Sequence, residues 1–101
     1  MLPVIPFSGM SNVIIVAYDI SDNKLRTRFS KFLEKYGVRV QFSVFEIRNS
    51  QRVLDIVLSS IESKFKKRFE PGDSIYIFTA NHDKTIRYGS ASLIDNDLII
   101  L

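Results

Sequence analysis

The stretch VIIVAYDISD, Val13 to Asp22, decides the fold of this chain. Its first five residues are apolar or small and rich in β-branched side chains, which predicts a strand over 13–19. No polar residue interrupts the run before an exposed Tyr18-Asp19 pair, so we expect a central strand with both faces covered. Ser21 and Asp22 are both suitable helix N-caps. The stretch therefore predicts a buried strand that carries one carboxylate at its end and leads directly into a helix.

Further along the chain, apolar residues recur at helical or strand spacing between turn signals. The predicted elements are a helix over 23–36, strands over 38–41 and 43–48, a helix over 51–68, a strand over 73–80, a turn over 81–84, a short strand over 86–88 and an edge strand over 98–101. The order β-α-β-β-α-β is that of the ferredoxin-like split βαβ sandwich, an α+β fold. We therefore predict a ferredoxin-like sandwich with an extra C-terminal edge strand.

The length of 101 residues corresponds to one small domain. We assign residues 10–101 to a single ferredoxin-like domain and 1–9 to an N-terminal extension, with Met10 as an alternative translation start. Pro3 and Pro6 interrupt what would otherwise resemble a signal peptide, and no apolar run approaches the ~20 residues of a membrane helix. Cysteine is absent, which suits a reducing compartment. We expect a soluble cytoplasmic protein with no membrane partner.

A ferredoxin-like sandwich places both helices on one face of its sheet and leaves the other face bare. The strands over 13–19 and 73–80 carry apolar residues on both faces, so the bare face needs a cover. A second copy of the chain is the simplest cover. We predict a homodimer through the sheet face, with the tail 89–101 pairing with the partner's sheet.

Few residues are candidates for chemistry. Without cysteine and with one histidine, His82, in a predicted turn, nucleophile-base pairs have no support. Glycine-rich phosphate loops are also missing. Asp19 is the remaining candidate. It either caps the following turn or is a functional carboxylate at the strand end. Ser21 and Asp22 already offer caps, so Asp19 is not needed for that role. Mg²⁺ prefers oxygen ligands, and one carboxylate from each chain of a dimer would suffice when phosphates complete the shell.

Basic residues surround this strand end in the sequence. Arg26, Arg28 and Arg39 are candidates for contacts with backbone phosphates, and the modest net charge of +3 permits a polyanionic partner. Lys24 and Lys31 are more readily explained as a solvated helix face. Arg26 falls on the opposite flank of its helix from those lysines. Tyr18 and Phe45 are expected to be packing residues, with stacking or positioning as the alternative.

Three motifs, Tyr18-Asp19-Ile20, Arg26-Thr27-Arg28 and the segment from Arg39 to Phe45, closely resemble the CRISPR-associated endoribonuclease two family. The resemblance covers about 12–78. It implies a ferredoxin-like homodimer in which Asp19 of each protomer binds Mg²⁺. It also assigns Tyr18, Arg26, Arg28 and Arg39 to the surroundings of that catalytic site, and Ser43 and Phe45 to the matching motif of the third strand.

The resemblance implies two functions. The first is a metal-dependent endonuclease acting on single-stranded RNA and/or double-stranded DNA in spacer acquisition and antiviral defence. The second is a non-catalytic DNA-binding scaffold that bridges dimers of the CRISPR adaptation integrase. The toxin-like VapD ribonucleases are similar in fold and strand-end Asp, and a small-ligand module is disfavoured by the lack of a polar pocket signature.

Overall fold

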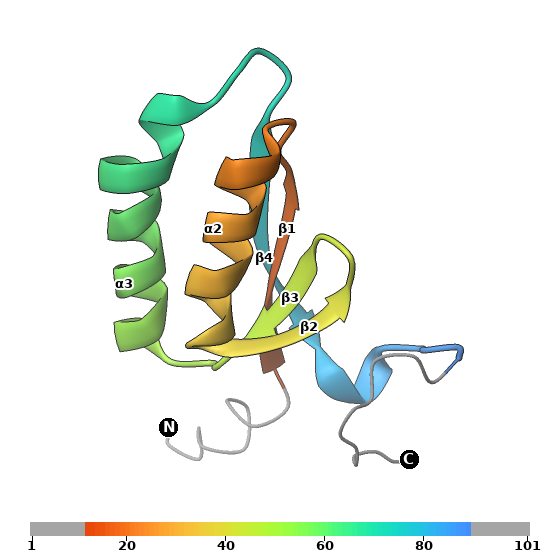
Figure 1. Cartoon of the computed structure of the whole chain (residues 1–101). Coiled ribbons are helices and arrows are strands. Elements are labelled where there is room, and N and C mark those ends of the chain that lie inside the picture. The colour runs from red at the N-terminus through yellow and green to blue at the C-terminus, as the bar shows by residue number, and fades with distance from the viewer. Residues whose placement is uncertain (1–11, 90–101) are drawn as a thin grey trace.

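The computed structural model of the protein describes residues 12–89. Its strands and main helices are β1 (Asn12–Asp19), α2 (Asn23–Glu34), β2 (Gly37–Gln41), β3 (Val44–Ile47), α3 (Gln51–Ser60) and β4 (Ser74–Asn81). A π-helical turn (Ile61–Phe65) and a 3₁₀ turn (Lys66–Arg68) prolong α3, and a further 3₁₀ turn (His82–Lys84) follows β4. Both main helices cover one face of the sheet (Figure 1).

The four strands form one sheet in the order β2-β3-β1-β4, and every neighbouring pair is antiparallel. This order confirms the ferredoxin-like α+β fold, with β1 in the interior as predicted. At the start of β2, Gly37 permits a close approach to β3: a Cβ atom there would lie 2.0 Å from the carbonyl oxygen of Glu46.

The helices begin where the sequence provides caps. The carboxylate of Asp22 accepts a hydrogen bond from the Leu25 amide at 2.8 Å, and the Ser50 hydroxyl accepts one from the Val53 amide at 3.3 Å. Each cap satisfies an amide that has no intrahelical partner. Asp22 therefore caps α2, and Asp19 is not needed for that purpose.

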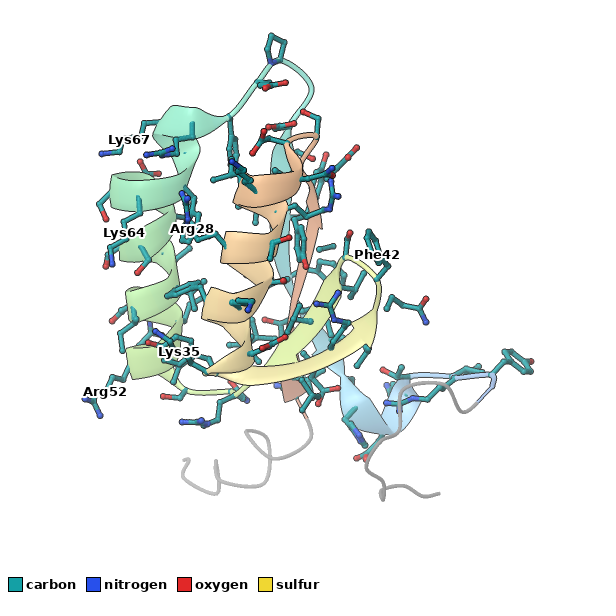
Figure 2. All side chains as sticks on the ribbon, in the orientation of Figure 1. Arg28, Lys35, Phe42, Arg52, Lys64 and Lys67 are labelled. Atoms are coloured by element: carbon teal, nitrogen blue, oxygen red, sulfur yellow. The ribbon has the colours of Figure 1, made fainter. Side chains whose placement is uncertain are left out.

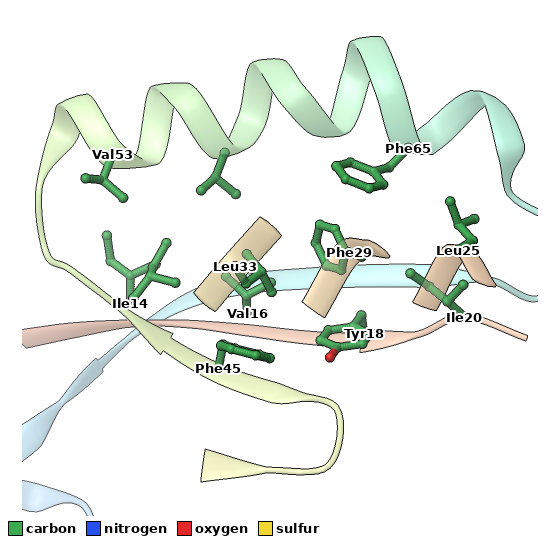
Figure 3. Packing of buried hydrophobic residues seen from close by; sticks show 12 residues of the cluster. Ile14, Val16, Tyr18, Ile20, Leu25, Phe29, Leu33, Phe45, Val53 and Phe65 are labelled. Atoms are coloured by element: carbon green, nitrogen blue, oxygen red, sulfur yellow. The ribbon is translucent and has the colours of Figure 1, made fainter. Parts of the chain in front are cut away.

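The core lies between the helices and the sheet. Ile14, Val16 and Tyr18 alternate along β1 and are buried, whereas Asp19 is exposed. From α2 and the turns after α3, Phe29 and Phe65 pack onto this face, with their ring centroids 4.9 Å apart (Figure 3). Because side chains alternate along a strand, Ile15, Ala17 and Asp19 lie on the opposite face of the sheet, which the helices leave uncovered.

Several sequence predictions need correction. The Tyr18-Asp19 pair is not exposed as a unit, because Tyr18 retains only 6% of its accessible surface. The helix predicted over 51–68 is α-helical only to Ser60 and then changes pitch. The strand predicted over 86–88 is wrong, since 85–89 form neither helix nor strand. The N-terminal extension 1–9 and the edge strand 98–101 lie outside the described residues. Within 12–89, no helix has the length and apolarity to cross a membrane.

Candidate metal and nucleic-acid site at the end of β1

Asp19 is the last residue of β1 and its side chain is exposed. It pairs with Ser74 of β4, and two residues back Ala17 pairs with Tyr76. Residues that alternate along a strand share a face, so Asp19 and Ala17 lie on the uncovered face of the sheet. The carboxylate therefore stands on the face of the sheet that the helices leave uncovered.

The other carboxylate near this strand end, Asp73, holds local structure. Its Oδ1 accepts hydrogen bonds from the amide and the hydroxyl of Ser21, each at 3.0 Å, and its Oδ2 accepts one from the amide of Glu70 at 2.9 Å. These bonds tie the loop after β1 to the turn before β4. The Glu70 and Ser21 amides lower the pKa of Asp73, because both favour the charged form.

These hydrogen bonds, together called the Asp73 clamp, predict that Asp73→Asn lowers the stability of the fold in a pH-dependent way. A lowered pKa in the folded state means that ionised Asp73 stabilises the fold above its unfolded pKa of about 3.9, and that this contribution is lost as pH falls through the lowered folded pKa. The variant should therefore unfold at lower temperature than the wild type at pH 7, and the difference should shrink at pH 3. Thermal unfolding at both values measures it, with Asp55→Asn on α3 as the control for loss of a surface carboxylate. An equal difference at both pH values would contradict the clamp.

Tyr18 lies on the opposite face of β1 from Asp19. Its ring meets Phe29 edge-on at 5.0 Å between centroids and stacks on Phe45 at 6.3 Å. Burial raises the pKa of Tyr18, and the guanidinium of Arg39 opposes the shift without cancelling it. The buried hydroxyl makes no hydrogen bond of good geometry, while the nearby Ser30 hydroxyl donates to the Thr27 carbonyl at 3.0 Å. Tyr18 therefore stays neutral and packs beneath the strand end.

Two arginines and the β2–β3 hairpin gather beside this end of β1. The Ser43 carbonyl accepts a hydrogen bond from the Tyr18 amide at 3.0 Å, which fixes the hairpin tip to β1. Arg26 donates to the Ile20 carbonyl at 2.9 Å. The guanidinium carbon of Arg39 lies 5.2 Å from the centroid of the buried Phe45 ring. The predicted site residues brought together here are Tyr18, Arg26, Arg39, Ser43 and Phe45, whereas Asp19 lies on the other, uncovered face of the sheet.

Arg28 does not join this group. It is exposed on the side of α2 that faces α3 (Figure 2). With Lys24 and Lys31 it lines a shallow depression. The helical spacing correctly predicted that Arg26 and Arg28 lie on opposite flanks of the helix, whereas the family resemblance grouped these two surfaces as one site. Sequence reasoning also missed Phe42, whose ring lies 5.8 Å from the Arg26 guanidinium carbon. An aromatic residue at the predicted junction of two strands was the available signal.

The donors at this strand end suit a hard cation shared between chains rather than one held by a single chain. In residues 12–89, no three His, Cys, Asp or Glu side chains are grouped so as to hold a metal ion. Asp19 supplies exposed carboxylate oxygens, the ligand type that Mg²⁺ prefers, and Mg²⁺ is commonly held by one or two carboxylates plus phosphate. The exposed Asp19 carboxylate therefore fits a magnesium ion whose remaining ligands come from phosphate or a further carboxylate.

Known proteins are similar to this chain in sequence and in fold. The model of the family described as CRISPR associated protein Cas2 matches residues 12–86. The CRISPR-associated endoribonuclease Cas2 3 of Chloroflexus aurantiacus is 35% identical over 85 residues, which are 79% of this chain and 86% of the relative. Streptococcus pyogenes Cas2 has a similar structure, with a TM-score of 0.63 and 21% identity over 76% of this chain and 99% of its own.

A chain of a solved partial Cas6-RT-Cas1–Cas2 complex is also similar. It is 30% identical to this protein, with a TM-score of 0.53, over 71% of this chain and 81% of that chain.

Proposed function

Because the chain belongs to the CRISPR associated protein Cas2 family, we propose that it is a Mg²⁺-dependent endonuclease that cleaves phosphodiester bonds in single-stranded RNA and/or double-stranded DNA during spacer acquisition and antiviral defence. The endoribonuclease name of its Chloroflexus relative supports the reaction class. The observation that carries the proposal is the exposed Asp19 on the uncovered sheet face. The neighbouring acids have structural roles: Asp22 caps α2, and Asp73 joins the loop after β1 to the turn before β4.

The proposed site is completed by a homodimer. The uncovered face exposes Tyr76 and Phe78 of β4, which keep 68% and 51% of their accessible surface in the single chain. Exposed aromatic patches of this kind favour association with another surface. Two copies that meet through this face would bring together two Asp19 carboxylates, one from each protomer.

Each group has a distinct role in the proposed reaction. The Asp19 carboxylates hold the cation, and a bound Mg²⁺ would supply Lewis-acid stabilisation of charge on the scissile phosphate. Arg26 and Arg39 are held by the Ile20 and Phe42 carbonyls on the helix side of this strand end, where they would neutralise and orient the nucleic-acid backbone. Tyr18 is buried between Phe29 and Phe45, so it supports the strand end by packing.

Removal of the metal tests this function. The purified protein is incubated with single-stranded RNA and with duplex DNA, each with Mg²⁺ or with EDTA, and cleavage is followed on denaturing gels. We expect cleavage of at least one substrate only with Mg²⁺, and we expect the activity to elute with the dimer in size-exclusion fractions. Undiminished cleavage in EDTA would reject the magnesium assignment, and activity that elutes apart from the protein would reject the nuclease.

A second function is the non-catalytic scaffold that bridges integrase dimers. The similarity to a chain of a Cas1–Cas2 complex supports a partnership with the integrase. The basic flank of α2, with Lys24, Arg28 and Lys31, lies away from Asp19 and suits contacts with the phosphates of a duplex. Because the two surfaces are separate, one protein can carry both functions.

A further inference from the structure

Phe42 is exposed in a way that the proposed catalytic site does not explain. It occupies the turn between β2 and β3, and its side chain keeps 72% of its accessible surface. Figure 2 shows it at the tip of the hairpin. A large apolar ring at a loop tip contributes little to the core, so its exposure requires another explanation.

Two anchored guanidinium groups adjoin this residue. Arg26 lies with its Cζ 5.8 Å from the Phe42 ring centroid, and its side chain is fixed by hydrogen bonds to the Ile20 carbonyl and to Asn23 Oδ1. Arg39 donates to the Phe42 carbonyl at 2.6 Å. A guanidinium nitrogen of Arg39 also lies 3.9 Å from a carboxylate oxygen of Glu34. Because this pair is solvent-exposed, Glu34 offsets little of the charge of Arg39. Since a guanidinium carries five N–H donors, both arginines keep donors for a phosphate.

The hairpin tip also adjoins the end of β1. The hydrogen bond from the Tyr18 amide to the Ser43 carbonyl joins the residue before Asp19 to the residue after Phe42. A nucleotide with its base on the Phe42 ring would therefore have its phosphate beside Arg26 and Arg39, near the end of β1. Asp19 follows Tyr18 on the other face of the sheet, so one strand of nucleic acid would have to pass around the end of β1 to meet both Phe42 and the Asp19 carboxylate.

We infer that Phe42, flanked by Arg26 and Arg39, is a stacking subsite for an unpaired nucleobase of a single-stranded nucleic acid. The inference rests on the proposed function for the choice of a nucleic acid as ligand. Every base presents a π-face, so such stacking tolerates any sequence. The bases of a duplex are already stacked on one another, so a duplex gains nothing from the ring except at its ends. The subsite therefore selects single strands.

Binding without cleavage tests the subsite. Fluorescence anisotropy in EDTA compares a labelled single-stranded oligonucleotide with a blunt duplex of the same sequence. Phe42→Ala and Phe42→Leu should each weaken single-strand binding about tenfold, the effect of losing one base–aromatic stack, and leave duplex binding unchanged. Phe42→Trp should retain it. Leu58→Ala, which shortens an exposed apolar residue of α3 in the helical layer, is the matched control and should change neither.

A second readout reports stacking directly. An oligonucleotide with 2-aminopurine should lose fluorescence on binding the wild type and much less on binding Phe42→Leu. Equal effects of Phe42→Ala on single strands and duplexes, dissociation of the dimer by Phe42→Ala, or no single-strand binding by the wild type would each overturn the inference. Because binding is measured in EDTA, it is independent of cleavage. Stacking by the wild type in an assay that shows no cleavage with Mg²⁺ would reject the nuclease but keep the subsite. Cleavage by the wild type together with unchanged single-strand binding by Phe42→Ala would reject the subsite but keep the nuclease.

Discussion

The Asp19→Asn variant is expected to lose cleavage by roughly a hundredfold or more, the scale on which removing one preorganised charge-stabilising group acts. The amide keeps the shape of the side chain and removes the negative charge that holds a cation. Asp19 is exposed and makes no structural contact comparable to the Asp22 cap or the Asp73 clamp. The variant should therefore fold and associate as the wild type does, and only the reaction should be lost.

The matched control is Asp55→Asn, which removes an exposed carboxylate from α3, in the other layer of the molecule. It should cleave at the wild-type rate. Circular dichroism and sedimentation of both variants establish that fold and association are intact. Full cleavage by Asp19→Asn in a preparation free of contaminating nuclease would reject Asp19 as the metal ligand. If cleavage is lost but spacer acquisition continues, the scaffold function is the one used in acquisition.

The fold was largely predictable because its signals are local. The apolar run of β1, the caps at Asp22 and Ser50, and the 3.6-residue periodicity of α2 each agree with the global topology. The errors fall where local rules are weak. The change of pitch after Ser60 depends on how Phe65 packs into the core, a tertiary contact that periodicity does not reveal. The residues after Lys84 have strand-like composition but no neighbouring strand among those described.

The site was less predictable, since it depends on which face of an element each side chain occupies. Because side chains alternate along a strand, Tyr18 and Asp19 point to opposite faces of the sheet. The expectation that both would be exposed treated these two neighbouring residues as one surface. Arg26 and Arg28 are two residues apart and so lie on different flanks of α2, one toward the hairpin and one toward solvent. The exposure of Phe42 follows from the hairpin geometry, which the sequence marks only as a junction of two strands.

Replacing Tyr76 and Phe78 together by threonine is expected to convert the proposed dimer to a monomer and to abolish cleavage while Asp19 remains intact. Tyr76 pairs with Ala17 and Phe78 with Ile15, so both rings stand on the uncovered face with Asp19. A fully buried Phe side chain contributes about 1.5–3 kcal/mol, and a dimer would bury four such rings. Threonine favours strands and adds no charge, so the sheet and the affinity for phosphate should be preserved.

Sedimentation at micromolar concentration and the cleavage assay measure the two effects on the same sample. Leu58→Gln, which removes an exposed apolar residue from α3, is the matched control and should stay dimeric and active. A double variant that remains dimeric would place the interface elsewhere. A folded monomer with full cleavage would instead show that one Asp19 suffices. Loss of both properties together is expected because each chain supplies a single carboxylate, so the uncovered face and the exposed Asp19 act as parts of one site.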